Sequence, residues 1–142
     1  MSNSEFKDRI LHLQDALRKL SELKEQPLTA VREHYTISDT ILYNLQIAIE
    51  ALTDIGNYLL KRGKHKIPRT RVETFELLCR NDYLKGIDED DLTTMSRFRN
   101  KLVHGYATVD IDVVYKILHN RYDFLRLIAI QLIEKSEELD EL

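Results

Sequence analysis

One eight-residue stretch of the sequence contains Arg99, Asn100, His104 and Tyr106. A guanidinium can hold a phosphate and stabilise the negative charge that develops on its oxygens. An imidazole has an ordinary pKa of about 6.5, so it can give or take a proton near neutral pH. A phenol, with an ordinary pKa of about 10, is a poor base under the same conditions. The stretch therefore predicts chemistry on a phosphodiester, with Arg99 holding the phosphate and His104 transferring protons.

The spacing of these residues sets a geometric condition. In a continuous helix Arg99 and His104 would lie about 140° apart around the axis and would not share a face. Gly105 allows the backbone to leave helical geometry just after His104, which then lies at the helix end and can swing toward Arg99. A helix C-terminus also favours the imidazolium form. We expect Arg99 and His104 to meet around one phosphodiester, with Asn100 contacting the same group or fixing the helix end.

Each of these residues also has an ordinary structural interpretation. A histidine at a helix end is more often a cap than a catalyst, and a single arginine is usually a surface or salt-bridge residue. Asp54 lies in line with Ile47, Ala51 and Tyr58, which form a partly buried stripe. A buried carboxylate needs a partner, so we expect Asp54 to pair with Arg99 or another cation of a neighbouring helix and to support the site.

The rest of the sequence predicts the helices that position this stretch. The chain has 142 residues, 43% of them apolar and 32% charged, with only four Gly and two Pro. This composition and the apolar periodicity predict one all-α domain over residues 1–142, an up-and-down bundle. The expected helices cover residues 4–24, 28–62 with a break near 34–38, 70–79, 90–103 and 110 onward. Ser4 is the expected N-cap of the first, and Thr70 with Glu73 forms a capping box for the third.

The apolar stripes of the two long helices are broad, which favours a homodimer formed through helix packing. The second helical stretch carries its stripe on Ile41, Leu45, Ala48, Leu52, Ile55 and Leu59. The last helix is expected to bury Val113, Val114, Ile117, Leu118, Leu125, Ile128 and Leu132.

The charge of the chain is unevenly distributed around a formal net charge of −3. A basic segment, residues 61–71, carries Lys61, Arg62, Lys64, Lys66, Arg69 and Arg71, and acidic residues crowd the C-terminal end. Nucleic acids respond to local fields rather than to total charge. Two interpretations of the basic segment stay open at this point: a solvated linker, or a surface that contacts RNA or an acidic partner.

Several function classes are disfavoured. Cys79 is the single cysteine and cannot form an internal disulfide. The histidines lack the spacing of a metal site, so no metal or cofactor is expected. No apolar run approaches the length needed to cross a bilayer, and the polar N-terminus lacks the pattern of a signal peptide. We therefore expect a cytoplasmic protein without membrane contact.

The pattern Arg-x4-His-x-Tyr, formed by Arg99, His104 and Tyr106, resembles the signature of HEPN-domain ribonuclease toxins, and of their HepT branch in particular. Residues 45–58 resemble the second helix of that family, and residues 70–79 and 109–118 fit its later parts. The resemblance covers most of residues 42–127. A short pattern alone recurs by chance, but within this order of helices it is a stronger signal.

The resemblance implies a function. Members of the family are helical bundles whose dimers bring two copies of the motif into one cleft, and they cleave RNA without a metal. They are toxins of type VII-like toxin–antitoxin pairs (HepT–MntA), in which a minimal nucleotidyltransferase antitoxin adds AMP to the motif tyrosine. If the family's roles are carried over to this sequence, the chain is an endoribonuclease that acts on tRNA or mRNA. Arg99 and His104 would then be catalytic and Asn100 would support them. Tyr106 would be the residue that receives AMP.

Two other functions stay open from the sequence. The chain could be a non-catalytic nucleotide-binding or assembly subunit of a nucleotidyltransferase complex, with Arg99 only gripping a phosphate. It could also be a scaffold in which the motif caps a helix. The presence of both Arg99 and His104 favours the ribonuclease, because a protein that only binds a phosphate does not need a group that transfers protons.

Overall fold

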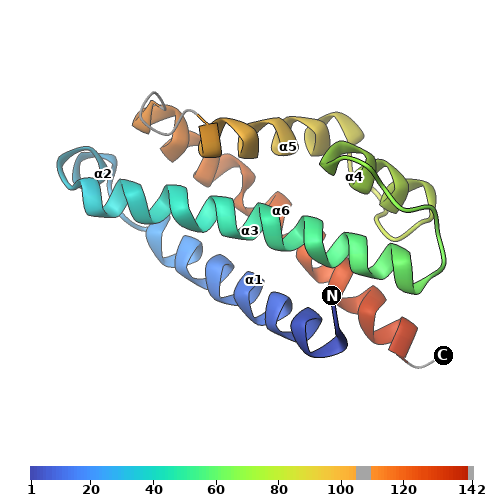
Figure 1. Ribbon diagram of the computed structural model, residues 1–142. Coiled ribbons are helices and arrows are strands. Elements are labelled where there is room, and N and C mark those ends of the chain that lie inside the picture. The colour runs from blue at the N-terminus through green and yellow to red at the C-terminus, as the bar shows by residue number, and fades with distance from the viewer. Residues whose placement is uncertain (105–109, 141–142) are drawn as a thin grey trace.

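The computed structural model describes residues 1–104 and 110–140 and arranges them as six helices (Figure 1). In chain order these are α1 (Asn3–Leu23), α2 (Leu28–Glu33), α3 (Tyr35–Arg62), α4 (Arg71–Arg80), α5 (Glu89–His104) and α6 (Ile111–Asp140). The described residues contain no strand. The predicted all-α class is therefore confirmed.

The helix boundaries follow the signals in the sequence closely. The expected break in the second helical stretch occurs at His34, which has extended backbone angles between α2 and α3. Thr70 caps α4 as predicted, because its hydroxyl accepts a hydrogen bond from the Glu73 backbone N–H at 3.1 Å. The predicted cap of α1 was wrong: Ser2, not Ser4, accepts from the Glu5 N–H, so the helix begins one residue earlier than expected.

The central element is α3, which contacts each of the other five helices. Its predicted apolar stripe is confirmed, since all six residues of the stripe are buried. The core cluster draws residues from every helix, among them Leu13, Val31, Leu52, Phe75, Leu92 and Leu118. Of the residues expected to be buried on α6, Val113 is 50% exposed and Ile117 is only partly buried, so the assignment of Val113 was wrong and that of Ile117 holds in part. Val113 lies in the first turn of α6.

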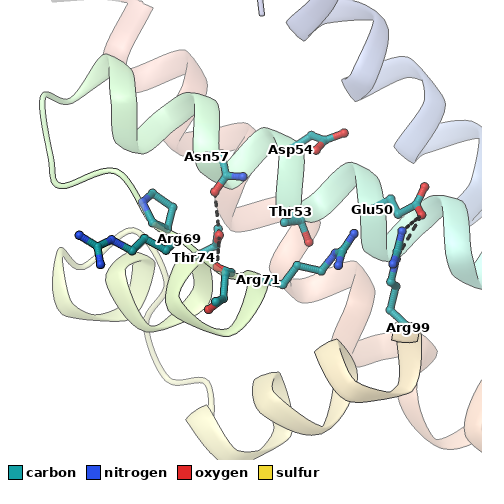
Figure 2. A pocket seen from close by; sticks show the side chains of 10 residues that line it. Glu50, Thr53, Asp54, Asn57, Arg69, Arg71, Thr74 and Arg99 are labelled. Atoms are coloured by element: carbon teal, nitrogen blue, oxygen red, sulfur yellow. Dashed lines mark hydrogen bonds and ion pairs between the residues drawn. The ribbon is translucent and has the colours of Figure 1, made fainter. Parts of the chain in front are cut away.

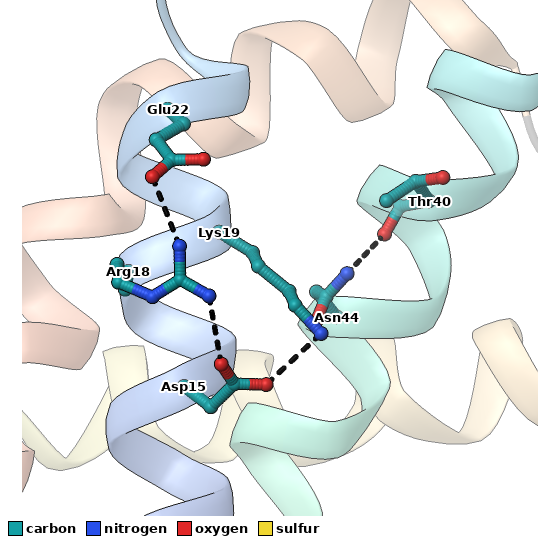
Figure 3. A network of polar contacts seen from close by, with 6 residues as sticks. All are labelled: Asp15, Arg18, Lys19, Glu22, Thr40 and Asn44. Atoms are coloured by element: carbon teal, nitrogen blue, oxygen red, sulfur yellow. Dashed lines mark hydrogen bonds and ion pairs between the residues drawn. The ribbon is translucent and has the colours of Figure 1, made fainter.

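The long helices α1 and α3 lie side by side in the bundle (Figure 1). On the exposed face of α1, Asp15 accepts hydrogen bonds from Arg18 at 2.9 Å and lies 2.9 Å from Lys19 (Figure 3). Such solvent-exposed pairs contribute little to stability. The position of α1 is therefore set by its apolar face, which buries Phe6, Leu13 and Leu17 among others.

A close approach of α3 and α4 occurs at Gly56. A Cβ atom placed there would lie 2.7 Å from Leu78 Cδ1 and 3.2 Å from Thr74 Cγ2. A side chain at this position would force the two helices apart or displace Leu78. The same contact brings Thr74 Oγ1 of α4 within 2.7 Å of Asn57 Oδ1 of α3. The spacing between these two helices is thus set by side chains of α4 packed against the bare backbone of Gly56 and by one part-buried hydrogen bond.

No helix among the described residues is both long and apolar enough to cross a membrane.

Candidate active site

An open cavity of about 480 Å³ lies between the helices α3, α4 and α5, beside Arg99 (Figure 2). Its lining is almost entirely polar. From α3 it takes Glu50, Thr53, Asp54 and Asn57; from the connection and α4 it takes Pro68, Arg69, Thr70, Arg71 and Thr74; α5 contributes Arg99. The cavity therefore joins the predicted catalytic arginine to the end of the basic segment.

The Arg99 side chain is 14% exposed and is held by Glu50. Its Nε donates to Glu50 Oε1 at 3.1 Å, and its Nη2 donates to the same oxygen. Hydrogen bonds between ionised groups are stronger than neutral ones, and two of them from one guanidinium fix its plane. Among the residues that the structure describes, Arg99 is engaged through Nε and Nη2, so no partner there occupies the Nη1 N–H donors, which an anion in the cavity could accept from.

Glu50 was missed by the sequence analysis as a functional residue. One signal could have found it: Glu50 precedes Asp54 by one helical turn, so the two carboxylates share a face of α3. Gln46 lies a further turn back, and its Nε2 donates to Glu50 Oε1 at 3.4 Å. The carboxylate that positions Arg99 is thus itself supported from its own helix.

Asp54 pairs with Arg9 of α1, with 3.4 Å between the Asp54 Oδ2 and Arg9 Nε atoms. We expected Asp54 to pair with Arg99 or with another cation of a neighbouring helix, and its partner is the second kind, Arg9. Arg99 pairs with Glu50 instead. Burial raises the pKa of Asp54, and the charge of Arg9 opposes the rise. Asp54 also lines the cavity. It therefore forms an ion pair with α1 and lies in the wall of the same cavity as Arg99.

The raised pKa of Asp54 predicts a pH-dependent stability. An aspartate whose pKa is raised in the folded protein stabilises it fully below its ordinary pKa, about pH 4, and loses this contribution as the pH rises through the raised value. Asp54→Asn removes the cost of burying the charge. We expect a melting temperature a few degrees above the wild type at pH 7, with the difference vanishing toward pH 4.

The control for this prediction is Asp15→Asn. Hydrogen bonds from Lys19 and Arg18 lower the pKa of Asp15, so its substitution is expected to change stability in the opposite direction at neutral pH. Thermal melts of both variants between pH 3 and pH 8 make the comparison. An Asp54→Asn protein less stable than the wild type at pH 7 would mean that the Arg9 pair outweighs the cost of burial.

The other predicted site residues lie at or beyond the end of α5. His104 is the last residue of that helix, as predicted, and Asn100 is exposed on it. The helix is continuous from Arg99 to His104, so their backbone positions are about 140° apart around its axis. The His104 side chain, Gly105 and Tyr106 lie outside the described residues. The meeting of Arg99 and His104 stays a prediction.

The basic segment divides into two parts. Near its start, Arg62 donates to the Leu139 carbonyl at 3.4 Å, and Lys66 Nζ lies 3.1 Å from Glu73 Oε1. A ring nitrogen of His65 contacts the Tyr83 hydroxyl at 3.0 Å, which ties the segment to the turn after α4. At its end, Arg69 and Arg71 line the cavity. Structural pairing thus accounts for Arg62 and Lys66, and from the second part Arg71 reaches toward Arg99 (Figure 2).

Within residues 1–104 and 110–140, no group of three or more His, Cys, Asp and Glu side chains is arranged to hold a metal ion.

An all-helical bundle with the Arg-x4-His pattern at the end of a helix, and with the arginine in a polar cavity, is the arrangement expected of the HEPN class. Comparison with known proteins agrees: the family described as ribonuclease HepT-like matches residues 13–132. The chain belongs to the ribonuclease HepT-like family. Its class of enzyme is therefore that of an endoribonuclease.

One relative supports the same assignment, and a solved structure shares the fold. The mRNA nuclease HepT of Shewanella oneidensis is 30% identical over 100 residues, which cover 70% of this chain and 75% of the relative. A tri-AMPylated HEPN toxin from Shewanella oneidensis, solved in complex with MNT antitoxin, superimposes with a TM-score of 0.80 at 21% identity. That match covers 94% of this chain and 99% of the other.

A second solved structure shares the fold. A toxin–antitoxin complex with AMP-PNP contains a chain that superimposes with a TM-score of 0.78 at 20% identity. The match covers 93% of this chain and 99% of that one. The bundle is therefore the fold found in toxin–antitoxin complexes of this kind.

Proposed function

We propose that this chain is the toxin of a toxin–antitoxin pair and that it cleaves RNA at the Arg99–His104 site without a metal. The observation that supports the site most directly is the Arg99 guanidinium, oriented by Glu50 at the rim of an open polar cavity one turn before the end of α5. Membership of the ribonuclease HepT-like family supplies the reaction class. The proposal takes residues 1–142 as one HEPN-like domain that acts in the cytoplasm.

The proposed reaction is a transfer within RNA. The ribose 2′-oxygen attacks the neighbouring phosphorus, its proton passes to a base, and the bond from phosphorus to the 5′-oxygen breaks as that oxygen takes a proton. His104 serves as base or acid, and Arg99 stabilises charge on the phosphoryl oxygens. The products end in a 2′,3′-cyclic phosphate and a 5′-hydroxyl. The need for a 2′-hydroxyl explains a preference for RNA over DNA.

A second copy of the chain is part of the proposal. The helical register separates Arg99 from His104 within one chain by about 140°. A homodimer that brings two α5 ends into one cleft would let His104 of one protomer face a phosphate held by Arg99 of its partner. The two histidines could then divide the acid and base roles, which a single imidazole must otherwise perform in sequence.

The proposed partner is a minimal nucleotidyltransferase antitoxin that transfers AMP to Tyr106. The tri-AMPylated HEPN toxin that shares this fold was solved with an MNT antitoxin. In this chain Tyr106 follows the end of α5 closely, so an added AMP would place bulk and negative charge near Arg99. The phosphate of the AMP would then compete with RNA for the same guanidinium.

A direct prediction concerns Tyr106→Phe. The variant lacks the phenol oxygen that accepts AMP, so coexpression with the cognate antitoxin is expected to leave it unmodified and active. Intact-mass measurement should detect one or more AMP additions on the wild type and none on the variant, and RNA cleavage should resist inhibition. Tyr83→Phe, a buried tyrosine elsewhere in the chain, is the control. AMP found on Tyr106→Phe at the level of the wild type would contradict the assignment.

The second candidate function is that of a non-catalytic subunit of a nucleotidyltransferase complex. In that case the same cavity would bind the phosphate of a nucleotide without any cleavage. Purified protein incubated with total RNA and with tRNA, in the presence of a chelator, separates the two. Cleavage that depends on His104 supports the ribonuclease. Binding of RNA or nucleotide without cleavage, in wild type and His104→Ala alike, supports the subunit.

A further inference from the structure

Two arginines of the cavity wall differ in where their side chains lie: Arg71 reaches toward the Glu50–Arg99 pair, whereas Arg69 is exposed and points away from that pair (Figure 2). Arg69 and Arg71 flank Thr70, the residue that caps α4, and both are part of the cavity wall. Among the residues that the structure describes, neither guanidinium makes a hydrogen bond or an ion pair. Arg71 is partly buried, so its charge faces the cavity rather than open solvent alone.

The carboxylates of the cavity are already matched to other cations. Glu50 accepts from Arg99, and Asp54 pairs with Arg9, which approaches from α1. Arg71 lies near enough to lower the pKa of Asp54, but as a weaker influence than Arg9. The charged side chains that line the cavity are Arg69, Arg71, Arg99, Glu50 and Asp54. With both carboxylates paired, the charge of Arg71 remains in excess inside the cavity, and the exposed Arg69 adds positive charge at its edge (Figure 2).

The neutral lining also presents donors. The Thr74 hydroxyl lies 2.7 Å from Asn57 Oδ1 and 3.1 Å from the Thr70 carbonyl oxygen, and its single proton can serve one of them at a time. In either orientation of the Asn57 amide, at least one of its N–H groups stays available to donate. A cavity that offers N–H donors and surplus positive charge matches phosphate oxygens, which only accept.

We propose that this cavity binds the RNA phosphodiester next to the one that is cleaved, with Arg71 as the main contact and Arg69 as the second. The proposal rests on the proposed function, because it places the cleaved phosphate at Arg99 on the opposite wall of the same cavity (Figure 2). The ligand class is the backbone of single-stranded RNA. A recessed cavity admits a phosphate more readily than the acidic surface of a folded partner, so RNA is favoured over a protein at this position.

The test is RNA binding by Arg71→Ala in the His104→Ala background, which removes cleavage from the assay. A fluorescent single-stranded oligoribonucleotide is titrated at several salt concentrations. We expect the affinity to fall about tenfold, as for loss of one hydrogen bond to a charged group. The slope of log affinity against log salt should fall by about 0.7, the value for one single-strand phosphate contact. Removing Arg69 as well should lower the slope further.

The matched control is Arg80→Ala on the same helix. Arg80 lies nine residues after Arg71, on the opposite side of α4, and makes only an exposed 3.9 Å ion pair with Glu76. It should leave the affinity and the salt slope unchanged. Arg71→Lys, which keeps the charge, should retain most of the slope and lose affinity only. Circular dichroism checks that every variant is folded.

The outcomes separate this proposal from the proposed function. If the wild type cleaves RNA but Arg71→Ala binds it as tightly as Arg80→Ala does, the cavity proposal is overturned and the cleavage site stands. If Arg71→Ala leaves RNA binding unchanged and weakens the complex with the nucleotidyltransferase, the two arginines contact a protein and the proposal is again overturned. If the wild type binds RNA through Arg71 but never cleaves it, the cavity proposal stands and the nuclease function fails.

Discussion

Replacing His104 by alanine is expected to lower the rate of RNA cleavage by about 10²–10⁴-fold, the usual contribution of a group that transfers protons in the transition state. The helical fold should stay intact, because His104 is the last residue of α5 and the core of that helix is formed by Leu92, Met95 and Leu102. Single-turnover cleavage of a labelled RNA measures the rate, and a thermal melt checks the fold.

The control for His104 is His12→Ala, which removes an exposed histidine from α1. It should cleave at the wild-type rate. Analysis of the product ends tests the proposed transfer, since a 2′,3′-cyclic phosphate is expected in every case where cleavage is seen. Full activity of His104→Ala would discard the mechanism. Mixing His104→Ala with an Arg99 variant tests the second copy, because a shared cleft would restore part of the activity in mixed dimers.

The second large effect is expected at Arg99. Loss of a group that stabilises charge on the reacting oxygens costs about 10²–10³-fold in rate. Arg99→Lys keeps the charge but lacks the planar fork that contacts Glu50 through Nε and Nη2. We expect Arg99→Ala to lose cleavage and Arg99→Lys to recover only a small part of it. Cleavage rates at saturating RNA distinguish this loss from weaker binding.

Arg99→Ala also leaves Glu50 without its cation, so a loss of stability could be mistaken for a loss of catalysis. The double variant Glu50→Gln with Arg99→Ala removes both charges. It should regain the melting temperature that Arg99→Ala loses, but it should not regain cleavage. A double variant that cleaves at the wild-type rate would exclude Arg99 from the reaction. A double variant as unstable as Arg99→Ala would mean that Glu50 is not the cause of the instability.

The sequence predicted the helices well because the relevant signals are local. The stripe on α3 follows from a 3.6-residue period, and the start of α4 follows from Thr70 and Glu73, which are three residues apart. The error at Ser4 shows the limit of such signals, since Ser2 and Ser4 offer the same hydroxyl and the choice depends on which backbone angles the chain adopts. The exposure of Val113 depends on which helices cover the start of α6.

The site was only partly predictable because its pairings are long-range. The position of Arg99 and the end of α5 at His104 follow from the sequence. The choice between Glu50 and Asp54 as partner of Arg99 depends on how α5 lies across α3, and the pairing of Asp54 with Arg9 depends on the packing of α1. No periodicity fixes these distances. Family resemblance located the motif, but the cavity that joins it to Arg71 required the folded chain.

The absence of a side chain at Gly56 has a consequence for how this enzyme could diverge. The close approach of the Leu78 and Thr74 side chains to Gly56 helps to set the distance between the α3 wall of the cavity, with Thr53 and Asn57, and the α4 wall, with Arg71 and Thr74. An alanine at position 56 would widen that distance or displace Leu78, without replacing any polar residue of the lining. Related chains could therefore change the shape of this cavity by a single small substitution behind it, without any change to the residues that line it.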